Sequence, residues 1–234
     1  MAKLLFFDLT HQYTLDGEEM PSVSEISRFA SREVYGDVSQ YNLDNACSRG
    51  TAVHKATEVL DKYGEVECAE DIENYIRAYV QFRKDFCIKD YAYIEKPLAS
   101  ESHKFAGTID RVLKVDECFA DKVSELCKDT IAINGNGMIE KVKGVRKPKV
   151  GSLAIIDIKS SSVVQNILAL IQLNGYDKLV EENGLGNVGA LFILHLHKDG
   201  TYKLLPVDIN EMLFTSCLCL HNALKKKKRN KKEN

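Results

Sequence analysis

The residues with the clearest chemical potential are a carboxylate and an amine in the stretch 151–162, GSLAIIDIKSSS. Leu153–Ile158 is a mostly β-branched apolar run with the length of a buried strand. Because side chains of a strand alternate between its two faces, Asp157 and Lys159 point to the same face. Removing two charges from water is costly, so the pair is either a structural ion pair or part of a functional site.

A second carboxylate, Asp110, ends the segment Gly107–Asp110 near the middle of the preceding predicted strand. If the two strands are neighbours in the sheet, Asp110 and Asp157 converge on one point. Two carboxylates at one point suit a hard divalent cation. By itself, an aspartate at position 110 would more often be a surface or capping residue.

A histidine, His54, lies in a predicted helix four residues after Gly50. The small glycine would allow another backbone to approach closely. A single helical histidine is usually an ordinary core or surface residue, but beside two carboxylates it becomes a candidate metal ligand. Glu58 lies one turn further on the same helix face and is either a neighbour of the metal site or a surface charge.

Two further polar side chains, Gln172 and Tyr176, share a face of the helix predicted after the Asp157 strand. In one interpretation, Tyr176 packs at the edge of the core and Gln172 is solvated. In the other, both reach the site, where they contact phosphate or orient Lys159.

The elements that must position these residues can be predicted from hydrophobic periodicity and turn signals. The first third is mainly helical, with strands and then a strand–helix–strand unit following, so we expect an α/β fold with a mixed sheet flanked by helices. We predict a hairpin over Asp16-Gly17, helices over about 22–31, 43–63 and 69–86, strands over 91–98 and 105–115, and a short helix over 118–128. Beyond it we predict a hairpin around Asn134-Gly135, a helix over about 164–182 capped by the serines 160–162, a hairpin over Asp199-Gly200, and a last helix to about Lys225 capped by Asp208 with Glu211.

The length of 234 residues predicts one domain, over 1–224, with a helical N-terminal part over about 22–88 and a basic insertion over about 116–150. No apolar run is long enough to cross a membrane, and the N-terminus does not have the pattern of a signal peptide. The cysteine count is odd, and we interpret all seven as free thiols of a reducing compartment, which predicts a cytoplasmic protein.

Positive charge gathers in two places. The last ten residues, 225–234, carry a net charge of +6 against −8 for the remainder, and we expect a disordered tail that is simply solvated, attracts phosphate or acts as a nuclear import signal. The insertion is either a solvated loop or a flap facing DNA. Its basic residues are Lys141, Lys143, Arg146, Lys147 and Lys149.

Four motifs in this order, GxxxH (50–54), GxxD (107–110), DxK (157–159) and QxxxY (172–176), resemble the RecB-type branch of the PD-(D/E)XK nuclease superfamily. The opening HQYTLDGEEMPSV also resembles phage-type exonucleases of this branch. The resemblance covers about residues 10–180. It implies a restriction-endonuclease-like core with a helical N-terminal arch, and a metal-dependent DNA nuclease.

Carried over by motif, the metal ligands would be His54, Asp110, Asp157 and the main-chain carbonyl of Ile158, with Lys159 catalytic. Gln172, Tyr176 and Arg49 would contact substrate, and Glu58 and Glu95 are weaker additional candidates. Carboxylate-rich coordination favours Mg²⁺ or Mn²⁺. Some relatives hold an iron–sulfur cluster through three clustered late cysteines; this sequence lacks that trio, which predicts no cluster.

The function implied is an exonuclease acting on single-stranded DNA or duplex ends in recombination, repair or phage replication. The resemblance also implies a prokaryotic or phage-encoded protein, with a recombination or replication protein as a candidate partner. The alternatives are a structure-selective endonuclease or resolvase, and a non-catalytic DNA-binding subunit that keeps the fold. The sequence gives neither the polarity of cleavage nor the oligomeric state.

Overall fold

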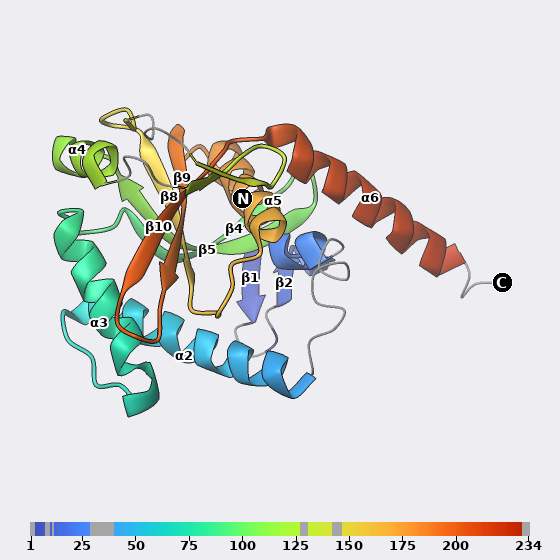
Figure 1. Cartoon of the computed structure of the whole chain (residues 1–234). Coiled ribbons are helices and arrows are strands. Elements are labelled where there is room, and N and C mark those ends of the chain that lie inside the picture. Colours follow the sequence, from blue (N-terminus) through green and yellow to red (C-terminus); the bar gives the residue numbers. More distant parts are fainter. Residues whose placement is uncertain are drawn as a thin grey trace.

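The computed structural model describes residues 3–7, 10, 12–28, 40–126, 131–141 and 147–230. Its centre is a seven-stranded mixed sheet in the order β4-β5-β8-β9-β10-β6-β7 (Figure 1). β8 and β9 are parallel, as are β10 and β6, and the other neighbours are antiparallel. The strands span Tyr93–Ser100 (β4), Phe105–Lys114 (β5), Leu153–Lys159 (β8), Val188–Leu196 (β9), Tyr202–Val207 (β10), Ile131–Ile133 (β6) and Ile139–Lys141 (β7).

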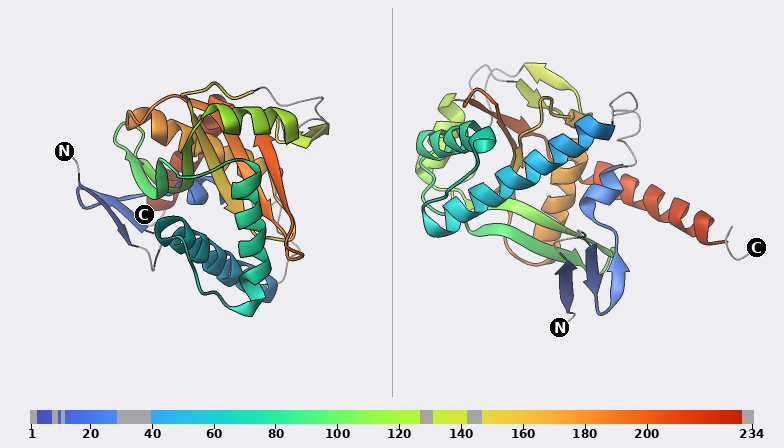
Figure 2. Two further views of the ribbon diagram at one scale, coloured as in Figure 1. Left: turned by 90° about the vertical axis from the view of Figure 1, so that its left-hand side faces the viewer. Right: turned by 90° about the horizontal axis from the view of Figure 1, so that it is seen from below.

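Helices cover both faces of this sheet, which confirms the predicted mixed α/β architecture (Figures 1 and 2). α3 and α4 lie on one face and α5 and α6 on the other, while α2 runs across one end of the strands. The helices span Gln40–Tyr63 (α2), Glu70–Asp85 (α3), Glu117–Leu126 (α4), Asn166–Glu182 (α5) and Glu211–Asn230 (α6).

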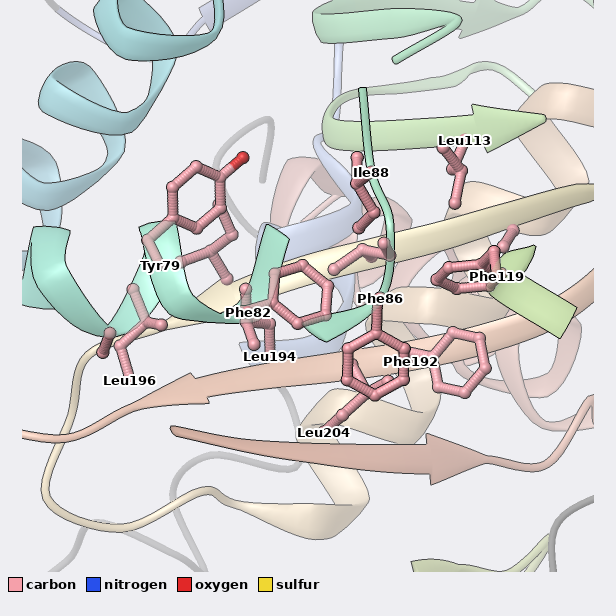
Figure 3. Close-up of a cluster of buried hydrophobic side chains, with 14 of the residues drawn as sticks. Tyr79, Phe82, Phe86, Ile88, Leu113, Phe119, Phe192, Leu194, Leu196 and Leu204 are labelled. Carbon is pink, nitrogen blue, oxygen red and sulfur yellow. The ribbon is translucent and has the colours of Figure 1, made fainter. Parts of the chain in front are cut away.

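The core between the sheet and α3 is rich in aromatic residues (Figure 3). Phe82 and Phe86 of the α3 region meet Tyr202 of β10, and Phe119 of α4 meets Phe192 of β9 edge to face. Ile156 and Ile158 of β8 belong to this core. The odd-numbered residue Ile155 belongs to the opposite core under α5, so Asp157 and Lys159 point to the α5 side, as the alternation predicts.

The core on the α5 side depends on a close helix crossing at Gly175. A Cβ at this position would lie 2.6 Å from the Phe214 ring of α6 and 2.9 Å from Val23. A larger residue would therefore push α6 and the short helix over 23–28 away from α5. This packing explains why α5 contains a glycine despite its low helix propensity.

A second, three-stranded sheet is formed by β1 (Leu4–Phe7), β2 (Gln12–Leu15) and β3 (Glu18–Met20). The β2–β3 hairpin turns over Asp16-Gly17, as predicted. The side chain of Tyr13, on β2, reaches β5, where its hydroxyl makes a 2.9 Å hydrogen bond with the hydroxyl of Thr108. The small sheet is thereby held beside the strand that carries Asp110.

Most predicted elements are confirmed, but some of their ends are wrong. α5 begins after Gln165, and no side chain caps it, so the serines 160–162 are not its cap. Asn210, not Asp208, accepts the Leu213 N–H at the start of α6, while Asp208 accepts the N–H of Gly135. α6 continues to Asn230, past the predicted end at Lys225. The predicted helix end near Ser31 lies outside the described residues.

The prediction of seven free cysteines is wrong for one pair. Cys87, after α3, and Cys118, in the first turn of α4, form a disulfide with their Cα atoms 6.2 Å apart. Sequence spacing could not reveal this pair, because it depends on how α3 and α4 pack. Within the described residues, Cys47, Cys68, Cys217 and Cys219 are free, and none of the helices could span a membrane.

Candidate metal centre

Three potential ligands from three elements meet at the end of the sheet that α2 crosses. His54 comes from α2, Glu95 from β4 and Asp110 from β5, and their ligand atoms lie within 4.8 Å of one another. Nδ1 of His54 is 3.6 Å from Oε1 of Glu95 and 3.6 Å from Oδ2 of Asp110. The prediction that His54 and Asp110 converge is confirmed, and Glu95, the weaker candidate, completes the group.

The other ring nitrogen of His54 faces β8. Nε2 lies 3.0 Å from the main-chain oxygen of Ile158. Burial lowers the pKa of His54, but the carboxylates of Asp110 and Glu95 outweigh burial and raise the pKa to about 9. The metal-free imidazole is therefore protonated, and its positive charge balances the two carboxylates.

Asp110 bridges β5 and β8 through its side chain. Arg111 pairs with Ile156 across these antiparallel strands, and Oδ2 of Asp110 accepts the N–H of Ile158 at 2.7 Å. Burial raises the pKa of Asp110, although His54 opposes this effect. The hydrogen bond fixes Asp110 next to the carbonyl that His54 contacts, so the main chain of Ile158 is part of the site.

A chain of polar contacts leads from β8 to α5. Nζ of Lys159 lies 2.7 Å from Oδ2 of Asp157 and donates to Oε1 of Gln172 at 3.1 Å. Nε2 of Gln172 then donates to the hydroxyl of Tyr176 at 2.8 Å. The four predicted residues thus lie together, and Gln172 with Tyr176 orients Lys159. A contact of either residue with substrate stays a prediction.

The surroundings of the Asp157 carboxylate indicate whether the site suits a cation. Asp157 is 1% exposed, and neither oxygen accepts a geometrically acceptable hydrogen bond within the described part of the chain; its charge is matched by the ion pair with Lys159. Burial raises the pKa of Asp157 to about 6, against the opposing effect of Lys159. Oδ2 therefore faces the ammonium of Lys159, and Oδ1 has no partner among the described residues. Asp157 is not one of the three residues grouped around His54, but a buried carboxylate with an unused oxygen next to that group fits a hard divalent cation.

Glu95 has an unusual backbone conformation. Its φ is +45°, in the left-handed region that non-glycine residues rarely adopt. The neighbouring register pairs are Ile94 with Arg111 and Lys96 with Ile109, so Glu95 stands opposite Asp110. Strained residues of this kind cluster at functional sites, which favours a role for Glu95 in the site. In the sequence, the only sign of this role was that Glu95 is acidic and lies on the strand before the one that carries Asp110.

The sequence reasoning missed the residue behind the site, Arg111. Its side chain is fully buried and hydrogen-bonds to Glu95 and to Asp61, a buried aspartate on α2. An arginine next to a predicted ligand in an apolar strand was a signal for a buried ion pair. Its partners could not be read from the sequence, since Asp61 precedes it by 50 residues.

The expectation that Gly50 permits a close backbone contact is wrong. Among the described residues outside its own helix, a Cβ at Gly50 would meet only Oγ of Ser160, at 4.0 Å. Arg49 lies over the ring of Tyr75 on α3, with 5.9 Å from Cζ to the ring centroid, and its contact with substrate stays a prediction. Glu58 pairs with lysines of its own helix, at 3.0 and 2.5 Å, rather than joining the His54 group.

The basic insertion forms the predicted hairpin, with β6 and β7 antiparallel around Asn134-Gly135. Lys147 pairs with Asp121 of α4, and Lys141 and Lys149 are exposed. Lys143 and Arg146 lie outside the described residues. That the basic insertion is a flap facing DNA stays a prediction.

Comparisons with known proteins give a likeness in structure only. No protein-family model matches the chain, and no curated protein matches it. Among solved structures, a candidate exonuclease from Eubacterium rectale is similar, with a TM-score of 0.44 and 11% identity over 86% of this chain and 76% of that one.

Proposed function

We propose that this protein is a metal-dependent deoxyribonuclease that acts as an exonuclease on single-stranded DNA or duplex ends. The observation that carries the proposal is the convergence of His54, Glu95 and Asp110 beside an Asp157–Lys159 pair. A set of carboxylates around a cation, with an amine next to it, is suited to phosphodiester hydrolysis. The order of the four sequence motifs supports the same reaction.

The donor set favours Mg²⁺ or Mn²⁺, since carboxylate oxygens dominate and one imidazole is present. His54, Glu95 and Asp110 would hold the cation, and Asp157 and the carbonyl of Ile158 border the same place. When bound, the cation would lower the pKa of a water ligand and polarise a phosphate oxygen.

Lys159 has the position expected of a group that assists the attacking water. Its ammonium is held between Asp157 and Gln172, and its side chain is 29% exposed, so it can reach a bound substrate. As an ammonium it orients the water and neutralises the charge that develops on the phosphate, and only after losing its own proton would it accept one from the water. Tyr176 holds Gln172 and thereby limits the positions that Lys159 can adopt.

The exonuclease assignment is supported by the position of α2. This helix crosses the end of the sheet where the site lies, and its His54 contacts the end of β8 (Figure 2). A site covered by a helix accepts a strand or an end more easily than the middle of a closed duplex.

The test is digestion of linear duplex, single-stranded and covalently closed circular DNA, each end-labelled where it has an end, with Mg²⁺, Mn²⁺ or EDTA. We expect metal-dependent loss of linear substrates and intact closed circles, with an Asp110→Asn variant inactive. Cutting of closed circles would mean that the protein is an endonuclease and not an exonuclease, and branched DNA would then be the next substrate to test. DNA binding without turnover by the intact protein would reject the enzyme altogether.

A further inference from the structure

Among the described residues that are fully buried, Arg111 has the largest side chain, and it lies directly behind the candidate metal centre. A buried guanidinium is expensive to desolvate and is retained only when its donors are satisfied. In this protein the donors are divided between two groups of acceptors. One group consists of Glu95, Thr57 and the main chain of Asp110, next to the metal ligands, and the other consists of Asp61 and Tyr79.

The donors on the side of the metal centre reach all three elements that supply ligands. Nη1 of Arg111 donates to Oε1 of Glu95 at 2.8 Å and to the main-chain oxygen of Asp110 at 2.7 Å. Nη2 donates to Oγ1 of Thr57 at 3.1 Å, and this hydroxyl donates to the main-chain oxygen of His54 at 2.9 Å. One planar group therefore links the backbones or side chains of His54, Glu95 and Asp110.

The remaining donor holds the guanidinium in place. Nε of Arg111 donates to Oδ2 of Asp61 at 2.6 Å and lies 3.3 Å from the hydroxyl of Tyr79. The other oxygen of Asp61 accepts Nη1 of Arg83 at 2.9 Å. Arg83 thus shares the anchor Asp61 with Arg111. Its other contacts among the described residues are with the main-chain oxygen of Lys89 and the ring of Tyr91, neither of which belongs to the metal centre, so Arg83 is a matched control.

We propose that Arg111 is a positioning residue of the metal centre, which holds the carboxylate of Glu95 in the orientation that binds the cation. The inference rests on the proposed function in that it requires a cation to bind at this centre. Because Glu95 stands at φ +45°, its side chain points where a regular strand residue would not, and the bond to Arg111 offsets that strain. A carboxylate has several lone-pair directions, so Glu95 can bind Arg111 and a cation together.

Charge alone does not account for this arrangement. A positive charge this close opposes a second cation, so a residue kept only for its charge would weaken metal binding. The planar fork of arginine spans acceptors that a single ammonium cannot reach together. Replacement by lysine keeps the charge and removes the geometry, and it therefore isolates the positioning effect.

The experiment measures Mn²⁺ binding to the full-length protein without DNA, by calorimetry or electron paramagnetic resonance. The proteins are the unmodified chain, Arg111→Lys, Glu95→Gln, the double variant and the control Arg83→Lys. We expect Arg111→Lys to weaken Mn²⁺ binding about 10- to 100-fold, as for other residues that orient metal ligands. In the Glu95→Gln background the same substitution should have no further effect. Arg83→Lys should lower the melting temperature and leave Mn²⁺ affinity unchanged.

Unchanged Mn²⁺ affinity in Arg111→Lys would overturn the inference, as would an equal loss with and without Glu95. If the unmodified protein itself binds no Mn²⁺, the proposed function fails instead, so the two failures are distinguishable. Should circular dichroism show that Arg111→Lys is unfolded, Thr57→Val takes its place. This variant removes the Nη2 acceptor at constant shape, and we expect a smaller loss of Mn²⁺ affinity that also disappears in the Glu95→Gln background.

Discussion

The imidazole Nε2 of His54 on α2 lies 3.0 Å from the main-chain oxygen of Ile158 on β8, across 104 residues of sequence. The same ring faces Glu95 and Asp110 through Nδ1. A helix outside the sheet is in this way joined to the end of a central strand. At Nδ1, which faces the two carboxylates, a proton and a cation compete for one place, and this competition gives the first prediction.

Mn²⁺ binding should strengthen with pH, because the pKa of His54 is raised to about 9 in the metal-free protein and the imidazole must lose its proton to bind metal. The affinity is expected to rise about tenfold per pH unit between about pH 7 and 8.5. His54→Gln should bind more weakly, with a flatter pH dependence. The control His103→Gln removes an ion pair with Glu182 of α5 that includes no residue of the metal centre, and its slope should match that of the unmodified protein. An unaltered slope in His54→Gln would show that another group titrates.

The lysine of the site should be required for cleavage but not for folding. We expect Lys159→Ala to lower the cleavage rate by about 10²- to 10⁴-fold, the usual contribution of proton transfer and charge stabilisation. Lys178→Ala is the matched control, because Lys178 forms an ion pair with Glu182 and its side chain is similarly exposed, at 23% against 29%. Cleavage assays and thermal melts of both variants are the measurements. Parental cleavage by pure Lys159→Ala would remove this residue from the mechanism.

Asp157→Asn should be inactive yet more stable than the parent without metal. Burial raises the folded pKa of Asp157 to about 6, so the folded state binds a proton more tightly than the unfolded chain. The carboxyl group therefore costs stability as pH rises from about 4 through 6, and the cost is largest above that window. The gain at pH 7 is at most about 3 kcal/mol, since two pKa units correspond to this energy.

Urea titrations of metal-free parent and Asp157→Asn at several pH values measure this effect. The difference in unfolding free energy should be smallest at the acidic end and grow with pH. A variant that is less stable than the parent at pH 7 would mean that the ion pair with Lys159 outweighs the cost of burial.

Two glycines in helices should respond to alanine in opposite directions. At Gly175 a Cβ would lie 2.6 Å from Phe214 and 2.9 Å from Val23, so Gly175→Ala should cost about 1–3 kcal/mol through overpacking. At Gly50 the nearest atom of the described residues outside its own helix is 4.0 Å away, and Gly50→Ala should stabilise α2 by up to about 1 kcal/mol. Thermal unfolding of both variants is the measurement, and a destabilised Gly50→Ala would contradict the open space found there.

The sequence by itself determined the local structure, because hydrophobic period, turn residues and breakers act over a few neighbours. It predicted the strand that carries Asp157, the hairpin over Asp199-Gly200 and the end of α2 before Gly64. It also predicted that Asp157 and Lys159 share a face, since alternation in a strand is a local property. The four ordered motifs also predicted that His54 and Asp110 belong to one site.

Only the tertiary structure decided which groups fill the centre. Glu95 joins the centre through a left-handed backbone conformation that no sequence pattern predicts. Arg111 pairs with Asp61, which lies 50 residues earlier in the sequence. The Cys87–Cys118 pair likewise depends on how α3 and α4 pack. Contacts between residues distant in sequence are set by the packing of whole helices against the sheet, and that packing reflects the sum of many weak contacts rather than any one spacing.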